Sequence, residues 1–453
     1  MRDVRQRPAL PPPASHLATS ASSLPASLPT RRNLLRTLAV GGTALLAPWP
    51  GGLRAAMGPQ DKFDLLVKGG EVLDPSQSLS GVRDVGIRHG RIEEVAAEIA
   101  RDRAVRVLDA AGKLVVPGMI DLHAHVFPYG SAIGLPADEL AQFQATTTAV
   151  SAGDAGANNF AAFRRFIVGA TRTRLFAFVH IANHGLGGFP VPELYNIDFA
   201  VTDLAARALA ENSDLVIGIK VRMSENVIAQ HGTVPLERAI KACELAGTGK
   251  VMTHIGGVQT VELMSRILDL LRPGDILTHC YSGAPNLAGQ FTNIVQDGKL
   301  LPAALAAKKR GVVFDVGHGG GSFDYTVAEA AIEQGAPPDT ISSDIHAVSG
   351  NTPGMPYLTW VASKFLNMGF TLGQVIEMTT SKPAAVIGRI PKHGTLQAGA
   401  PGDISLLEKV DGPVEFVDTR NNRRQGKVHL RPAGTVVGGT VLGRPYSAPF
   451  SVR

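Results

Sequence analysis

Short apolar segments alternate with amphipathic segments along most of this chain, and this alternation is the strongest constraint on its fold. Segments with helical apolar spacing, such as residues 235–245, 261–271 and 326–334, lie between runs that read as buried strands. Eight strand candidates are present, at residues 115–121, 145–151, 175–183, 215–221, 250–254, 275–280, 311–316 and 340–344. Eight strands separated by helices predict a (β/α)8 TIM barrel of the α/β class.

The regions on either side of the barrel have a different texture, with short strands separated by tight turns. We therefore predict a barrel at residues 117–394 and a small composite β-sandwich domain that residues 57–116 and 395–453 form together. A doubly wound sheet is the alternative for the central part, but no G-x-G-x-x-G motif follows its first strand. With 44% hydrophobic and 18% charged residues, the 453-residue chain is neither disordered nor a coiled coil, and two cysteines exclude a disulfide scaffold.

The formal net charge of +5 suggests a nucleic-acid partner until the charge is located along the chain. Residues 1–56 contain seven arginines and one acid, which leaves 37 basic against 38 acidic side chains in the rest. Because no basic stripe remains outside this segment, we expect no nucleic-acid partner.

Residues 1–56 read as a disordered leader. Arg31 and Arg32 precede an uncharged run of about fourteen residues, 37–50, which is too short to span a bilayer. This pattern resembles a Tat export signal, which predicts the Tat machinery as a partner, a periplasmic or exported location and no stable membrane span. If the leader is instead a wrongly assigned start, the protein is expected in the cytoplasm.

Residues with metal-binding chemistry stand at the ends of the predicted strands. In a barrel of this type, the carboxyl ends of the strands form one mouth, where catalytic groups lie. Imidazole and carboxylate groups are the ligands expected for zinc or a similar divalent ion. The strand ends contribute His123, His125, Lys220, His254, His279 and Asp344.

Lys220 is the unusual member of this set, because an ammonium group has no lone pair for a metal. Burial and nearby cations lower the pKa of a lysine, and the neutral amine can add carbon dioxide to form a carbamate. A carbamate has two oxygens and can bridge two metal ions. The constellation therefore predicts a modified lysine, N6-carboxylysine, at Lys220.

With these six residues at its strand ends, the chain resembles members of the amidohydrolase superfamily, in the dihydroorotase-related amidohydrolase/deacetylase branch. Residues 117–121 before the histidine pair, and residues 394–396 and 399–403 after the barrel, also carry the likeness. The resemblance implies two divalent ions, zinc by default, with carbon dioxide bound as the lysine carbamate. It assigns His123, His125, Lys220 and Asp344 to one ion, and Lys220, His254 and His279 to the other. It also implies a metal-bridging hydroxide as nucleophile and Asp344 as general base and acid.

Further polar residues near the strand ends are candidates for binding a small-molecule substrate. Arg222 lies two residues beyond Lys220, so on a regular strand it faces the same mouth and could clamp a carboxylate. A salt bridge at the rim is the alternative role for Arg222. The other candidates are His184, Tyr281, His318 and His346.

The predicted function is metal-dependent hydrolysis of an amide or ester bond in a small N-acyl or O-acyl carboxylic acid, as in a deacetylase. A cyclic amidase, a lactonase and a prolyl-dipeptidase-type enzyme are the alternatives among hydrolases. A barrel isomerase and a non-catalytic barrel scaffold are the alternatives from other classes. Family analogy also raises the possibility of a homo-oligomer.

Overall fold

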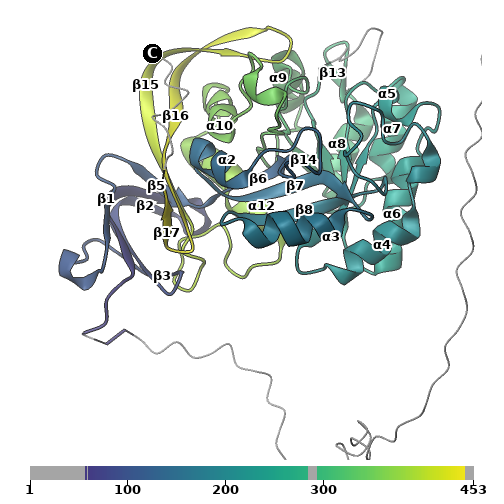
Figure 1. Cartoon of the computed structure of the whole chain (residues 1–453). Helices are drawn as coiled ribbons and strands as arrows, with labels where there is room; N and C mark the ends of the chain where they lie inside the picture. The colour runs from purple at the N-terminus through teal and green to yellow at the C-terminus, as the bar shows by residue number, and fades with distance from the viewer. Residues whose placement is uncertain (1–56, 59, 284–292, 444–453) are drawn as a thin grey trace, which may run out of the picture. The chain divides into compact units, whose positions relative to one another are not determined.

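The computed structural model describes residues 57–443, apart from residue 59 and residues 284–292 (Figure 1). The predicted leader, residues 1–56, lies outside the described residues. In the part of the chain that is described, no helix has both the length and the apolar character needed to cross a bilayer.

The centre of the molecule is a parallel sheet whose seven strands are neighbours in chain order. Most of their residues are buried, as expected for a sheet that is covered on both faces. The strands are β6 (Met119–Ala124), β7 (Thr146–Gly156), β8 (Arg174–His180), β9 (Val216–Arg222), β10 (Lys250–His254), β11 (Ile276–Thr278) and β14 (Val313–Asp315).

The eighth predicted segment, 340–344, closes the barrel without forming a regular strand. Thr340 makes a parallel bridge to Asp315 of β14, and Ile345 makes one to Ala124 of β6. Asp344 has a φ of 49°, in the left-handed region, which interrupts the extended backbone that a strand requires. The Asp344 amide nevertheless donates to the His123 carbonyl at 2.7 Å, so the barrel is complete and Asp344 lies beside β6.

Helices cover the outside of this sheet (Figure 1). The amphipathic segments predicted at 235–245, 261–271 and 326–334 correspond to α6, α7 and α9. The helices are α2 (Ala137–Gln144), α3 (Phe160–Ala162), α4 (Thr202–Glu211), α5 (Glu225–Ile228), α6 (Val234–Ala246), α7 (Val261–Leu270), α8 (Pro302–Arg310), α9 (Tyr325–Glu333), α10 (Leu358–Asn367), α11 (Leu372–Thr379) and α12 (Ser381–Ile387).

Helix α7 illustrates how the sequence specifies these elements. The Thr260 side chain accepts a hydrogen bond from the Leu263 amide and so caps the first turn. Met264, Ile267 and Leu268 follow the i, i+3, i+4 spacing and are buried, which gives the helix one apolar stripe toward the barrel.

The two flanks of the barrel join in one eight-stranded mixed sheet. Strand β5 pairs antiparallel with β15, and this contact unites the N-terminal and C-terminal flanks. Strand β1 pairs with β4 over its first half and with β5 over its second half, so the sheet branches around a separate apolar core. The strands are β1 (Leu65–Asp74), β2 (Leu79–Arg88), β3 (Arg91–Ala96), β4 (Val107–Asp109), β5 (Leu114–Pro117), β15 (Ile404–Val417), β16 (Arg423–Val437) and β17 (Thr440–Leu442).

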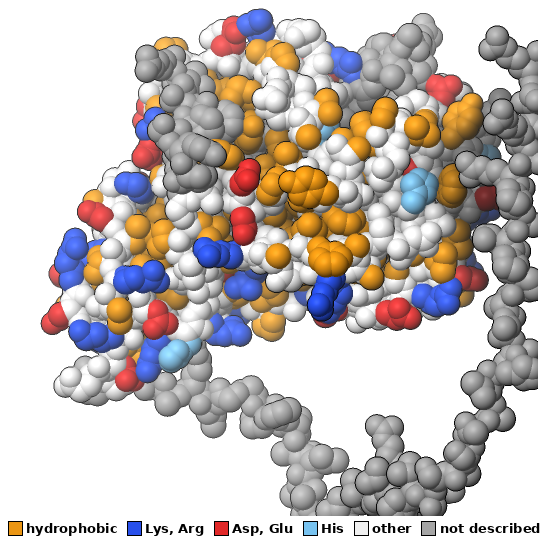
Figure 2. Space-filling view, in the orientation of Figure 1, with side chains coloured by type: hydrophobic (Ala, Val, Ile, Leu, Met, Phe, Trp, Pro, Cys, Tyr) orange, Lys and Arg blue, Asp and Glu red, His pale blue; other side chains and the backbone are white. Residues whose placement is uncertain are grey.

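Strands β15 and β16 form a long hairpin that runs beside α10 (Figure 1). The Ser363 hydroxyl of α10 accepts from the Leu430 amide at 2.8 Å, and the Asn367 amide group donates to the Val428 carbonyl at 2.8 Å. A second, short hairpin consists of β12 (Val295–Gln296) and β13 (Lys299–Leu300). On the face shown in Figure 2, basic and acidic side chains are interspersed, without a continuous basic stripe.

Candidate active site

The six predicted metal ligands meet at the carboxyl ends of the barrel strands. His123 is in β6 and His125 follows it, Lys220 is in β9, and His254 ends β10. His279 comes directly after β11, and Asp344 lies in the closing segment. All six are buried except His254, which is partly buried.

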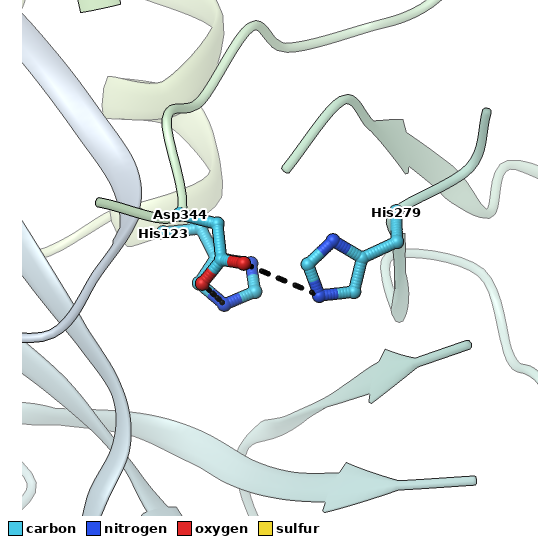
Figure 3. A group of neighbouring side chains, drawn as sticks. All are labelled: His123, His279 and Asp344. Carbon is cyan, nitrogen blue, oxygen red and sulfur yellow. Dashed lines mark ion pairs between the residues drawn. The ribbon is translucent and has the colours of Figure 1, made fainter. Parts of the chain in front are cut away.

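Short distances connect these six side chains into one cluster. Asp344 Oδ1 lies 3.1 Å from His123 Nε2 and 3.0 Å from His125 Nε2, while Asp344 Oδ2 is 3.9 Å from His279 Nε2. Figure 3 shows the Asp344 carboxylate between His123 and His279, with a dashed contact to each ring. Lys220 Nζ is 3.0 Å from His123 Nε2, and His254 Nδ1 is 2.8 Å from His279 Nε2.

The way the imidazoles are held fits a metal site. His123 Nδ1 contacts the Thr278 hydroxyl at 2.7 Å, and His125 Nδ1 contacts Asp154 Oδ1 at 2.8 Å. His279 Nδ1 contacts the Gly317 carbonyl, which can only accept, so His279 carries its proton on Nδ1. The protein therefore engages Nδ1 of these three rings and directs Nε2 toward the shared centre. His123, His279 and Asp344 place one donor atom each within 4.8 Å of one another, a donor set suited to a divalent cation.

The electrostatics of the cluster favour neutral forms of His123, His279 and Lys220 and the ionised form of Asp344. Burial, assisted by the charge of Lys220, holds the pKa of His123 well below its usual range. Burial also lowers the pKa of His279 to about 4 and that of Lys220 to about 7. For Asp344, burial alone would raise the pKa, but His123 and His125 outweigh it and keep the carboxyl ionised. Metal binding requires neutral imidazole and ionised carboxylate, so the shifts of His123, His279 and Asp344 suit it.

A second row of acids supports the cluster, and the sequence interpretation did not include it. Asp154 binds His125 and also accepts from the Val126 amide at 2.9 Å and the Ser151 hydroxyl at 2.7 Å. Burial alone would lower the pKa of His125, but Asp154 and Asp344 raise it to about 9.

The Thr278 hydroxyl connects His123 to a buried carboxylate, that of Asp315. The Thr278 hydroxyl donates to Asp315 at 2.8 Å, and Asp315 also accepts from the hydroxyls of Thr340 and Ser342 at 2.6 Å each. Both Asp154 and Asp315 stand at the ends of strands, β7 and β14. The strand-end rule that identified the histidines could therefore have identified these two acids.

A small cavity of about 60 Å³ opens onto the cluster. Its wall is partly apolar, through Ile133, Leu186 and Phe189, and partly polar, through Arg222 and His346. His346 Nδ1 accepts from the amides of Val348 and Ser349, both at 3.3 Å. The four metal-ligand candidates in the wall are His125, Lys220, His254 and Asp344.

Arg222 is ion-paired with a buried acid that the sequence interpretation missed. Its Nη1 lies 3.2 Å from Glu193 Oε1 and 3.0 Å from Oε2. Burial alone would raise the pKa of Glu193, but Arg222 and His180 hold it at about 2. Glu193 lies in the long connection between β8 and α4, where no periodic pattern singled it out.

Three other predicted substrate residues do not line this cavity. The Tyr281 hydroxyl donates to the Ala336 carbonyl at 2.9 Å. His318 lies between Lys364 Nζ at 2.7 Å and the Gly319 carbonyl at 2.9 Å, and the His184 ring packs edge-on against Phe199.

Backbone turns explain two of these positions. His279 has a φ of 62°, and the glycines on both sides of His318 also have positive φ. The chain turns at these points, so two-residue spacing from a strand no longer predicts which way Tyr281 or His318 points.

Comparison with known proteins gives a consistent result. The sequence model described as "Amidohydrolase family" matches residues 322–442. A deacetylase from Agrobacterium fabrum is 32% identical over 354 residues, covering 78% of this chain and 84% of the relative. A deacetylase from Enterococcus faecalis is 31% identical over 381 residues, covering 84% of this chain and 99% of the relative.

Solved structures agree with these sequence relatives. A structure described as a dihydroorotase has a TM-score of 0.76 at 30% identity, covering 83% of this chain and 97% of its own. One described as an adenine deaminase has a TM-score of 0.75 at 30% identity, covering 84% and 99%. Together with the barrel and its histidine–aspartate cluster, these similarities establish that the chain belongs to the amidohydrolase family of metal-dependent hydrolases.

Proposed function

We propose that this protein hydrolyses the acyl bond of small N-acyl or O-acyl carboxylic acids, as a deacetylase does. The observation that carries the proposal is the convergence of three imidazole Nε2 atoms on Asp344 beside a cavity that also contains Arg222. The names of the sequence relatives support it, since those that match most of the chain are called deacetylases. Water is added across the amide or ester bond, which gives a short acid and an amine or alcohol.

We further propose how the residues hold two ions. His123, His125, Lys220 and Asp344 would hold one, and Lys220, His254 and His279 the other, with Lys220 carrying carbon dioxide as a carbamate. The lowered pKa of Lys220 supports this assignment, because the carbamate forms from the neutral amine. When bound, the ions, for which zinc is our first choice, would polarise the scissile carbonyl and lower the pKa of water.

The protein's own groups supply proton transfer and orientation. Asp344 Oδ1 is engaged by His123 and His125, and Oδ2 lies 3.9 Å from His279 Nε2. Asp344 is therefore the group that accepts the proton of the attacking water and passes it to the leaving group. Arg222 binds the substrate carboxylate, and Ile133, Leu186 and Phe189 exclude water from the acyl side.

Hydrolysis of a cyclic amide is the second candidate. The structural similarity to a protein described as a dihydroorotase, at a TM-score of 0.76, favours it over the remaining alternatives.

The experiment is a metal analysis of the full chain followed by an activity panel. The panel contains N-acyl amino acids, acylated hydroxy acids, lactones and cyclic amides, each with and without a chelator. We expect two divalent ions per chain and chelator-sensitive hydrolysis of at least one acyl acid. Two bound ions with hydrolysis of cyclic amides alone would replace the first function by the second. Absence of both metal and hydrolysis would indicate a scaffold.

A further inference from the structure

Arg222, in the wall of the cavity, contacts Glu193 through only one of its guanidinium nitrogens. Both contacts from Arg222 to Glu193 come from Nη1, at 3.2 and 3.0 Å. Among the described residues, no hydrogen bond from Nε or Nη2 of Arg222 is recorded, and its side chain is 16% exposed. The Nε–Nη2 edge presents two parallel N–H groups, the geometry that matches a carboxylate.

Glu193 is fixed firmly enough to orient that guanidinium. Its side chain is only 3% exposed, and Oε1 lies 3.2 Å from His180 Nε2. His180 Nδ1 accepts from the Ala182 amide at 3.0 Å, so the ring carries its proton on Nε2, which lies close to Glu193 without the alignment of a hydrogen bond. His180 is the register partner of Lys220 across β8 and β9, so Glu193 is anchored directly behind the metal-ligand strand.

The same contact shapes the cavity wall and its charge. Glu193 belongs to the connection between β8 and α4, and this connection also supplies Leu186 and Phe189 to the wall. Without Glu193, the Arg222 cation would stand uncompensated beside Lys220 and the imidazoles, and a buried, unpaired charge is costly.

We propose that Glu193 is a specificity-determining residue, which fixes Arg222 so that its Nε–Nη2 edge receives the carboxylate of the substrate. This inference rests on the proposed function and refines it. The preferred substrate is an acyl compound whose amine or alcohol fragment carries one carboxylate, and the neutral amide of the same compound is a poor substrate.

The test measures kcat and KM for matched pairs, an N-acyl amino acid and its primary amide, with the metal-loaded full chain. For Glu193→Gln we expect KM for the acid to rise about tenfold with little change in kcat, and the values for the amide to stay within twofold. Arg222→Met raises KM for the acid further. Asp198→Asn, which removes an exposed acid from the same connection, is the matched control. It should leave kcat and KM unchanged for both the acid and the amide.

Two results would overturn the inference. A lower KM for the acid in Glu193→Gln would mean that Glu193 competes with the substrate for Arg222. Equal losses on the acid and the amide would mean that Glu193 acts only through the general structure.

A binding measurement separates this inference from the proposed function. Thermal shifts are recorded with the acid and with the amide, and need no turnover. Acid-selective stabilisation that is lost in Arg222→Met and reduced in Glu193→Gln supports the role of Glu193 even if no compound is hydrolysed. Acid selectivity that persists in Arg222→Met refutes it, because the carboxylate then binds elsewhere, even if hydrolysis is observed.

Discussion

Replacing Asp154 by asparagine tests whether the second row of acids controls metal binding. Asp154 accepts three hydrogen bonds, from His125 Nδ1, the Val126 amide and the Ser151 hydroxyl. An amide has one oxygen, so it cannot replace both carboxylate oxygens. If its oxygen faces His125, its NH2 group meets the Val126 N–H, and an unpaired buried donor costs about 1–3 kcal/mol.

The other orientation of the amide affects the metal directly. An NH2 group that faces His125 Nδ1 requires a lone pair there, which moves the ring proton to Nε2, the nitrogen that faces Asp344. Loss of such a support weakens metal binding by about 10–100-fold, which corresponds to about 1.4–2.8 kcal/mol. We therefore expect Asp154→Asn to lose metal affinity, or apo-state stability, or part of each.

The assay combines chelator competition for the metal with thermal unfolding of the metal-free protein. Ser151→Ala is the control, because it keeps the carboxylate and its contact with His125 and removes one hydroxyl. Its metal affinity should change less than tenfold. If Asp154→Asn leaves both the metal affinity and the apo-state stability within twofold of wild type, Asp154 does not support His125 and the reasoning fails.

Four further predictions concern single groups. Lys220→Ala should lose tightly bound metal and most activity, with partial rescue by short carboxylic acids, as metal content and turnover will show. Asp344→Asn should keep its metal while kcat falls about 10²–10⁴-fold, and an unchanged kcat would remove its role in proton transfer. In the metal-free protein, the lowered pKa of Glu193 contributes about 3 kcal/mol of stability above pH 4.5, lost as the pH falls toward about 2, so acid unfolding should show a smaller pH dependence in Glu193→Gln. A reporter fused to residues 1–56 should be exported, and changing Arg31 and Arg32 to lysine should stop export; continued export would refute the Tat prediction.

The six metal-ligand candidates, which form the inner row of the site, were predictable because the strand-end rule needs only chain order. Parallel strands in a closed barrel bring their carboxyl ends together, whatever the intervening sequence. His123 in β6 therefore contacts Thr278, the last residue of β11, although the two are 155 positions apart in the sequence. His279 follows Thr278 directly and so reaches the same mouth. The rule also brought Asp344 to this mouth, and in the structure Asp344 lies beside β6, although its left-handed backbone prevents a regular strand there.

The outer row of acids, which consists of Asp154, Asp315 and Glu193, was not predicted, for two different reasons. Asp154 and Asp315 obey the strand-end rule, but a single aspartate at the end of a strand resembles many solvated acids until a partner is identified. Glu193 follows no periodic pattern at all. Its burial depends on a tertiary contact with Arg222, 29 residues away, and on the path of a long connection. Local sequence patterns do not specify such a path.

The two rows together explain how so many charged groups can be buried at one point. Asp344 alone cannot balance Arg222 and a protonated His125, and an unpaired charge in this environment would be strongly destabilising. Asp154 stands behind His125, and Glu193 stands behind Arg222. Asp154 accepts from three donors, and Glu193 accepts from Arg222 through both of its carboxylate oxygens. Removing Glu193 would leave the charge of Arg222 uncompensated, and removing Asp154 would allow the ring proton of His125 to move to the wrong nitrogen. The outer row should therefore affect metal binding and substrate selectivity first, although none of its members needs to touch the substrate.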